Sequence, residues 1–170
     1  MADVTNVAIG PCNVSINGVD VGHTIGGAEV AYSPSFKDIM VDKYGDTVVE
    51  KALIGEGFKV KFKMAESTML NFKKAIPLGT LAGGDARLTI GKDAGELLSS
   101  TAYEVVLHPN QNLPANLADD VVLYKAVCVS EIVIPYRHNE ERVFEVEFAA
   151  LIDETKSDGS YLGLIGDSTA

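Results

Sequence analysis

Hydrophobic and polar residues alternate along several short stretches of the chain. The clearest stretch has four apolar residues on one face and three lysines on the other: Phe58, Val60, Phe62 and Met64 against Lys59, Lys61 and Lys63. Residues 144–148 repeat the pattern with glutamates on the polar face, and residues 103–107 give a third case. Because side chains of a strand alternate between its two faces, each stretch predicts a half-buried strand.

Three further stretches predict strands by composition and position. Residues 28–32 and 47–54 are rich in β-favouring residues, and the glycines of Gly55-Glu56-Gly57 indicate a hairpin turn that follows the second. Residues 121–134 are apolar on both faces for much of their length. This run predicts a strand in the centre of a sheet.

One segment has the spacing of a helix. Ala65, Met69, Phe72 and Ile76 would form one apolar stripe on a helix of about three turns, spanning residues 65–76. Residues 66–68 supply an N-terminal cap and a negative charge, and a proline follows residue 76. One helix among about eight strands predicts a mainly β fold, a β-sandwich or barrel-like sheet pair with one flanking α-helix.

The remaining segments are expected to be connections. Residues 33–46, 78–85 and 108–120 are polar or rich in glycine and proline, which predicts exposed loops. The length of 170 residues suits one domain, which we place at residues 1–152. The small and polar residues 153–170 are expected to be a C-terminal arm or a flexible tail.

The net charge and the apolar content of the sequence exclude some classes of function. The chain carries 24 acidic and 14 basic residues, a formal net charge of −10. Phosphate backbones repel such a protein, so tight binding of DNA or RNA is not expected. The sequence has no run of 18 apolar residues, and its first residues do not resemble a signal peptide. We therefore expect no membrane association and a product that is cytoplasmic when made.

No set of residues predicts catalysis, a metal site or a cofactor. The three histidines, His23, His108 and His138, are far apart, and none has a second ligand at metal-binding spacing. The acidic residues 153–158 do not fit the calcium-loop template. A phosphate-binding loop is also not expected at Gly26 and Gly27, because a strand rather than a helix follows them.

The two cysteines predict no metal site and no redox motif. Cys12 and Cys128 are far apart in sequence and form no Cys-x-x-Cys pair. In a reducing compartment the ordinary interpretation is two buried thiols.

Three features follow one another between residue 21 and residue 76: the Gly26-Gly27 entry to a strand, the Asp42 to Gly45 element, and a strand that ends in Ala65-Glu66-Ser67 before the helix. In this order they resemble the major tail protein, or tail tube, family of long-tailed, non-contractile bacteriophages. The resemblance covers about a third of the chain closely. No single feature is diagnostic, but their combination is more specific than any part.

The resemblance implies a structural virion protein with no enzymatic activity. Family members are β-sandwiches with one flanking helix, related to the inner tubes of contractile tails and of type VI secretion. Six subunits form a ring with a continuous inner barrel, and rings stack into a tube through which DNA passes. Implied partners are other copies of the chain, a tape measure protein, a tail terminator and baseplate or initiator proteins.

The resemblance also implies two groups of functional residues. Residues 33–46 would be a ring-stacking loop, with these residues at its centre: Phe36, Asp38, Asp42, Lys43, Tyr44 and Gly45. Acids on alternating strand positions are candidates to face the lumen and keep DNA away from the wall: Glu29, Glu50, Glu131, Glu145 and Glu147. The alternative for each acid is an ordinary solvated strand face.

Three other classes of protein remain open at this point. A head-decoration or tail-terminator subunit is also a β-sandwich without catalytic residues, and a type VI or tailocin inner-tube subunit shares the tube fold. An enzyme or carbohydrate-binding sandwich would need a concave cluster of acids and aromatics. This chain has no Trp and few other aromatic residues.

Overall fold

The computed structural model describes residues 10–169. Its elements are ten strands and one α-helix: β1 (Cys12–Ile16), β2 (Val19–Asp20), β3 (Thr24–Met40), β4 (Val48–Met64), α1 (Met69–Ala75), β5 (Thr80–Ala82), β6 (Arg87–Thr89), β7 (Tyr103–Pro109), β8 (Val121–Cys128), β9 (Phe144–Ala150) and β10 (Gly163–Ile165). Short 3₁₀ turns lie at Asp42–Tyr44 and Leu98–Thr101. The predicted mainly β fold with one flanking helix is confirmed.

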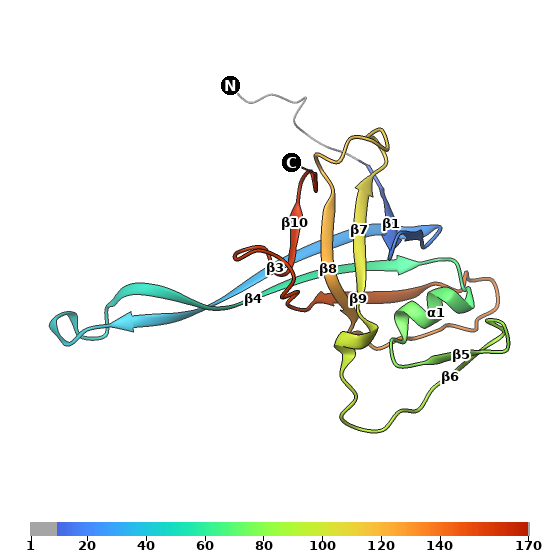
Figure 1. Ribbon diagram of the computed structural model, residues 1–170, viewed down its shortest axis with the longest axis horizontal. Coiled ribbons are helices and arrows are strands. Elements are labelled where there is room, and N and C mark those ends of the chain that lie inside the picture. The colour runs from blue at the N-terminus through green and yellow to red at the C-terminus, as the bar shows by residue number, and fades with distance from the viewer. Residues whose placement is uncertain (1–9, 170) are drawn as a thin grey trace.

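Eight of the strands form one antiparallel sheet. The strand order is β2-β1-β7-β8-β9-β4-β3, and β10 pairs with β8 beside this path. β5 and β6 form a separate two-stranded sheet near α1. In Figure 1 the strands β1, β7 and β8 run at a steep angle to β3, β4 and β9, so the sheet bends strongly and packs one part against the other.

The core lies between these two parts of the sheet. The alternating apolar residues of the sequence form it as predicted, with Phe62, Val60, Val146 and Phe148 almost completely buried. The rings of Phe62 and Phe148 stack with their centroids 5.9 Å apart. Apolar residues of β1, β7 and β8 complete the same cluster. Burial of these side chains is the main term that stabilises the fold.

The helix is shorter than the predicted span of residues 65–76. Ala65 still donates a backbone hydrogen bond to the carbonyl of His23, which keeps the chain extended beside the start of β3. Thr68 is the N-cap, because its side-chain oxygen accepts a hydrogen bond from the backbone N–H of Asn71 at 3.1 Å. Phe72 attaches the helix to the sheet by stacking on Phe144, with centroids 5.0 Å apart.

Glu66, which follows the end of β4, contacts the chain just before β3. The carboxylate of Glu66 accepts a hydrogen bond from the backbone N–H of His23 at 3.0 Å. Gly22 has φ +82, and a Cβ atom at this position would lie 2.2 Å from that carboxylate. Asn71 fixes the same corner by donating from its side chain to the carbonyls of Val21 and Glu66, both at 2.9 Å. The glycine therefore makes room for a close connection between the start of β3 and the segment that leads into the helix.

The predicted turn at Gly55-Glu56-Gly57 is wrong. These residues lie inside β4, which runs without a break from Val48 to Met64. The pairing with β3 shifts between Ser35 and Phe36, opposite Gly55 and Leu53, so one extra residue sits on β4 as a β-bulge. Gly57 marks a close approach instead of a turn, because a Cβ atom there would lie 2.7 Å from the Ser33 hydroxyl.

Three other boundaries differ from the predictions. The central strand predicted over residues 121–134 lies between β7 and β9 as expected, but it ends at Cys128. The connection predicted over residues 78–85 contains β5, and the one predicted over residues 33–46 is strand as far as Met40. The pairing of β3 with β4 is irregular at the glycine pair, with a shift between Thr24 and Ala28.

The two cysteines are free thiols. Cys128 is buried as predicted, whereas Cys12 is half-buried, and burial raises the pKa of its thiol. Across residues 10–169, no helix combines the length and apolar character that crossing a membrane would require.

Candidate assembly interface

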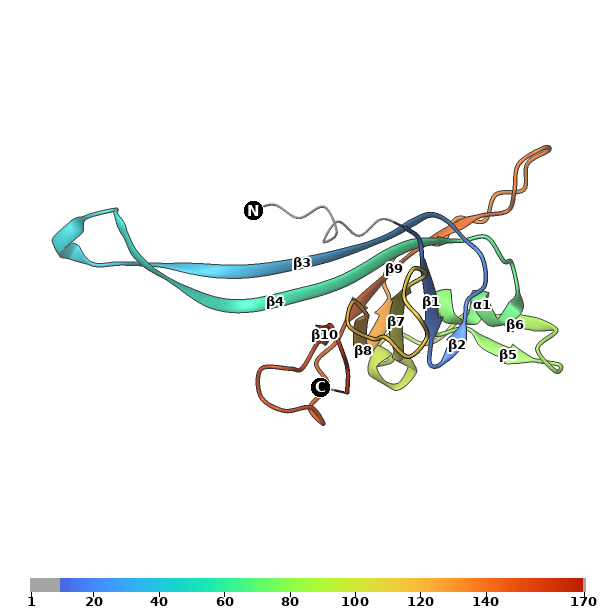
Figure 2. The same ribbon diagram turned by 90° about the horizontal axis from the view of Figure 1, so that it is seen from above.

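The β3–β4 hairpin extends far beyond the rest of the molecule (Figures 1 and 2). Each of its strands has 17 residues, which at about 3.3 Å per residue makes an arm of about 55 Å including its root in the sheet. Among the described residues, β4 pairs with β9 only over Lys59–Met64, and β3 pairs only with β4. The outer half of the hairpin is therefore a two-stranded ribbon without further strand partners.

The outer half of the hairpin is rich in exposed apolar side chains. Ten of them are 41–66% exposed: Tyr32, Phe36, Ile39, Met40, Val41, Tyr44, Val48, Val49, Leu53 and Ile54. Tyr32, Phe36 and Met40 lie on the face of β3 that begins with Ala28, which packs against the core. Asp38 lies on the same face, so exposed apolar residues continue along the arm without a strict apolar-polar pattern.

Such an arm gains little stability from its own contacts. A two-stranded hairpin is at best marginally stable in water. The exposed ion pair between Lys51 and Asp38 contributes at most about 1 kcal/mol. Contiguous exposed apolar surface of this kind marks interaction sites in soluble proteins. The geometry thus favours a surface that becomes buried against another molecule.

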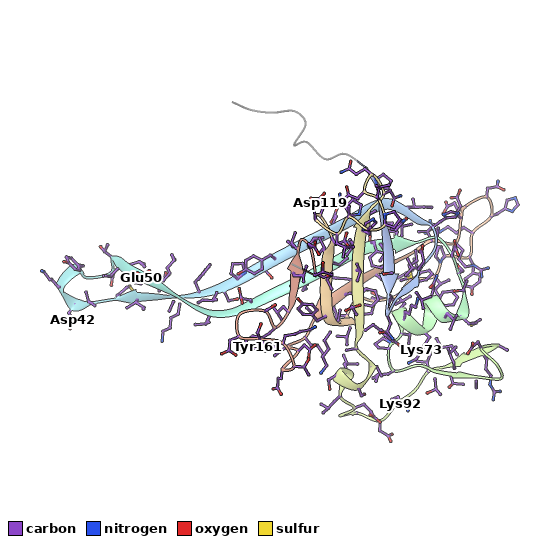
Figure 3. The ribbon with its side chains drawn as sticks, turned by 45° about the horizontal axis from the view of Figure 1, so that its top comes forward. Asp42, Glu50, Lys73, Lys92, Asp119 and Tyr161 are labelled. Atoms are coloured by element: carbon purple, nitrogen blue, oxygen red, sulfur yellow. The ribbon has the colours of Figure 1, made fainter. Side chains whose placement is uncertain are left out.

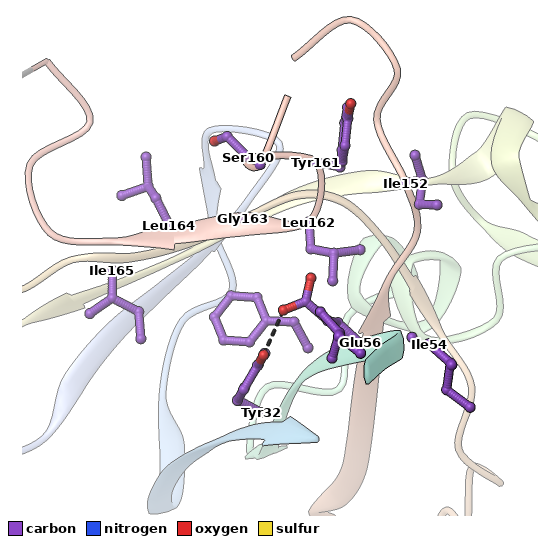
Figure 4. A pocket seen from close by; sticks show the side chains of 14 residues that line it. Tyr32, Ile54, Glu56, Ile152, Ser160, Tyr161, Leu162, Gly163, Leu164 and Ile165 are labelled. Carbon is purple, nitrogen blue, oxygen red and sulfur yellow. Dashed lines mark hydrogen bonds between the residues drawn. The ribbon is translucent and has the colours of Figure 1, made fainter. Parts of the chain in front are cut away.

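A groove of about 520 Å³ lies at the root of the hairpin, between β3–β4 and the C-terminal segment (Figure 4). Its lining is mostly apolar and includes Ile54, Ile152, Leu162, Leu164 and Ile165. Among the described residues, Glu56 is the only charged one that lines the groove, and its carboxylate accepts a hydrogen bond from the Tyr32 hydroxyl at 2.5 Å. This hydrogen bond raises the pKa of Tyr32.

One wall of the groove comes from the segment predicted to be a C-terminal arm or tail. Gly163–Ile165 pair with Val121–Leu123 of β8, and the backbone N–H of Gly166 donates to the carbonyl of Asp120 at 2.8 Å. Gly163 fits there because it has no side chain: a Cβ atom would lie 2.2 Å from the carbonyl oxygen of Val122. This part of the segment belongs to the sheet, while the division at residue 153 stays a prediction.

The hairpin contains all six residues of the predicted ring-stacking loop. Phe36 and Asp38 lie in β3, and Asp42, Lys43 and Tyr44 form the 3₁₀ turn at the tip, which Figure 3 locates through Asp42. Gly45 ends the turn with φ 60, a value that favours glycine. The Lys43 ammonium lies 5.3 Å from the centre of the Tyr44 ring. The predicted loop is thus the distal part of an ordered hairpin, and its role in stacking stays a prediction.

The predicted lumen acids do not form one row. Glu29, Glu145 and Glu147 share the outer face of the sheet, Glu50 lies far out on the hairpin, and Glu131 is on no strand because β8 ends before it. The prediction that all five occupy alternating strand positions is therefore wrong for Glu131.

Acids and lysines alternate across the outer face of β3, β4 and β9. Lys59 pairs with Glu147 at 2.8 Å, and Lys61 pairs with Glu145 at 3.0 Å. The hydrogen bond to Glu145 and the nearby acids raise the pKa of Lys61. Two of the three lysines of the row therefore have acidic partners within the same subunit, and this face carries balanced charge.

The described part of the chain offers little else that suggests a metal-binding or catalytic site. Among residues 10–169, no three His, Cys, Asp or Glu side chains gather where they would hold a metal ion. His108 Nδ1 lies 2.7 Å from the buried Asp120 carboxylate, which joins the end of β7 to the start of β8. Sequence reasoning placed both residues in an exposed loop and missed this pair, as it missed the groove.

No known family model matches the chain, and no curated protein matches it. Its function is therefore inferred from its own residues and their geometry.

Proposed function

We propose that the protein is the major tail subunit of a long-tailed, non-contractile bacteriophage, which assembles into stacked hexameric rings that form a tube for DNA. The observation that supports this proposal best is the long hairpin with its exposed apolar residues, projecting from a mainly β body. Tube subunits need a surface that reaches the next ring, and the hairpin offers both the reach and the apolar area.

Burial of these exposed apolar side chains on association would contribute a large favourable free energy. Full burial of one large apolar side chain contributes about 1.5–3 kcal/mol. Covering even a few of the ten exposed residues of the hairpin would offset a substantial part of the cost of association. A subunit stored as a monomer would instead carry an arm that invites non-specific contacts.

The unpaired edges of the sheet favour association of subunits into a ring. Within the described residues, β3 and β2 are the terminal strands of the sheet path, and the outer edge of β3 is unpaired over a long distance. Unpaired edges are templates for further strands, and closing a ring of subunits pairs them. In the proposed assembly, neighbouring subunits in a ring meet at these edges.

The charges are compatible with a wall that DNA slides past. The net charge of −10 disfavours tight binding to phosphates. On the outer face of the sheet, Lys59 and Lys61 are already paired with glutamates. If this face lines the tube, it offers balanced rather than acidic charge. In the virion, the tape measure protein, tail terminator and baseplate or initiator proteins are the proposed partners.

Negative-stain electron microscopy of the purified full chain tests this proposal. We expect rings with six-fold symmetry and tubes of constant diameter, at high protein concentration or after an initiator complex is added. Particles of monomer size alone, under both conditions, would contradict the proposal.

A further inference from the structure

We propose that the groove at the root of the hairpin is the receptor for the hairpin tip of a second copy of the chain. The groove is the cavity lined by Ile54, Ile152 and Leu162–Ile165, and the tip is residues 40–48. This inference rests on the proposed function, because it names the site at which one subunit holds the arm of another.

The groove is formed by ordered strands and loops, but the apolar side chains that line it remain largely exposed. Ile54, Ile152 and Ile165 remain 61–70% exposed although they line a cavity of about 520 Å³. Pockets of about 300–1,000 Å³ with mostly apolar walls are typical binding sites. In Figure 4, Ile54 and Ile152 lie on one side of the opening and Leu164 and Ile165 on the other. An occupant with large apolar side chains would cover all of them.

The tip of the same chain is not a suitable occupant. The 3₁₀ turn begins 12 residues before Ile54 in sequence, and the extended hairpin directs it away from the groove (Figure 2). Six of the intervening residues, 48–53, are in extended strand, and they alone span about 20 Å. Since the two strands are paired over this distance, the arm would have to fold sharply to reach its own root.

The tip of a second copy has the matching chemistry. Met40, Val41, Tyr44 and Val48 are each 41–54% exposed and lie around one tight turn. Of the charged residues of the tip, Lys43 has the sign that suits Glu56, the one charged residue among the described residues that line the groove. Asp42 and Asp46 have the same sign as Glu56 and would have to stay in solvent. The chain thus carries both an apolar tip and an apolar receptor at separate places on its surface.

This arrangement allows growth without a fixed end, provided that the rotation between neighbouring copies does not close a ring. When two different surfaces of identical subunits join, each added copy exposes a new receptor or a new tip. The contact therefore suits the stacking direction of a tube rather than a closed pair of subunits. It also gives the C-terminal segment a defined role, because β10 supplies one wall of the receptor.

Two double variants of the full chain test this inference, first each variant alone and then the two variants mixed. The tip variant is Met40→Ser with Tyr44→Ser, and the receptor variant is Ile152→Ser with Ile165→Ser. All four side chains are at least half exposed, so both variants should fold. The matched control is Ile90→Ser with Leu97→Ser, which changes two equally exposed residues away from both surfaces.

Sedimentation velocity and electron microscopy report the outcome. For each double variant alone, we expect the protein concentration needed for stacked assemblies to rise at least 100-fold. The control should assemble at the same concentration as the native chain. In an equal mixture, intact receptors meet intact tips, so short complexes that contain both variants should form, and long tubes should not.

The outcomes also distinguish this inference from the proposed function. If the receptor variant forms tubes normally while the tip variant does not, the hairpin mediates assembly at some other surface, and the receptor assignment is overturned. The same holds if both variants fail alone but form no complex when mixed. If the tip variant also forms normal tubes, the role of the hairpin in the proposed function fails as well.

Discussion

A chain without the outer hairpin should fold normally but no longer assemble. The change replaces residues 36–54 by an Asn-Gly pair, which then connects Ser35 to Gly55. Ser35 and Gly55 are partners in the β3–β4 ladder, and Asn-Gly is the preferred two-residue hairpin turn. Removing residues 33–46 alone would delete part of β3 and leave its partner strand unpaired.

The expected result follows from where the core lies. No buried core residue falls within residues 36–54, so the midpoint of thermal unfolding should change by only a few degrees. The deletion removes nine of the ten exposed apolar side chains of the arm, all except Tyr32. At about 1.4 kcal/mol per tenfold change in affinity, loss of even two buried contacts would weaken assembly by orders of magnitude.

Sedimentation velocity measures assembly, and thermal unfolding followed by circular dichroism reports the fold. Monomeric, cooperatively unfolding protein is the expected outcome. Tubes of normal length from the shortened chain would show that the outer hairpin is not the assembly element.

Gly163→Ala should detach β10 from the sheet. A Cβ atom at this position would lie 2.2 Å from the backbone carbonyl of Val122 and 2.9 Å from the ring of Phe58. Because a backbone atom within a paired strand has little freedom to withdraw, β10 must move away. Overpacking of this kind costs about 1–3 kcal/mol. The rest of the core should remain, since β10 contributes no residue to the fully buried set.

Limited proteolysis and denaturant unfolding measure this effect. We expect rapid cleavage after residue 152, a fall in the free energy of unfolding of about 1–3 kcal/mol, and poor assembly because the groove has lost a wall. The matched control is Gly55→Ala, which also lines the groove but would place its Cβ in open space. Equal protease resistance of the two variants would contradict the assigned packing of Gly163.

The alternation of apolar residues predicted a large part of the core, although it missed β1, whose Val14 and Ile16 are also buried. The pattern at residues 58–64 and 144–148 placed Phe62 and Phe148 inside correctly, because one face of each strand is buried and the other is solvated. The helix was also found, and its N-cap is Thr68, one of the residues 66–68 that were predicted to supply the cap. Its stripe includes Phe72, which packs on the sheet as the spacing requires.

The hairpin and the groove could not be predicted from local pattern. Gly55 and Gly57 resemble a turn in sequence, but pairing with β3 holds them in an extended strand, so tertiary pairing overrides the local signal. The outer hairpin lacks the clean apolar-polar alternation of a half-buried strand, because both of its faces are exposed. The groove joins residues 32–58 to residues 152–165, and no sequence periodicity reports that contact.

Amide hydrogen exchange of the native chain tests the central claim most directly, namely that the hairpin is the surface by which copies hold one another. The measurement compares backbone amides of residues 33–56 in the monomer and in the assembled state. We expect these amides to exchange much more slowly after assembly, and the core strands β7 and β9 to change little. Equal exchange of the hairpin amides in both states would contradict the claim.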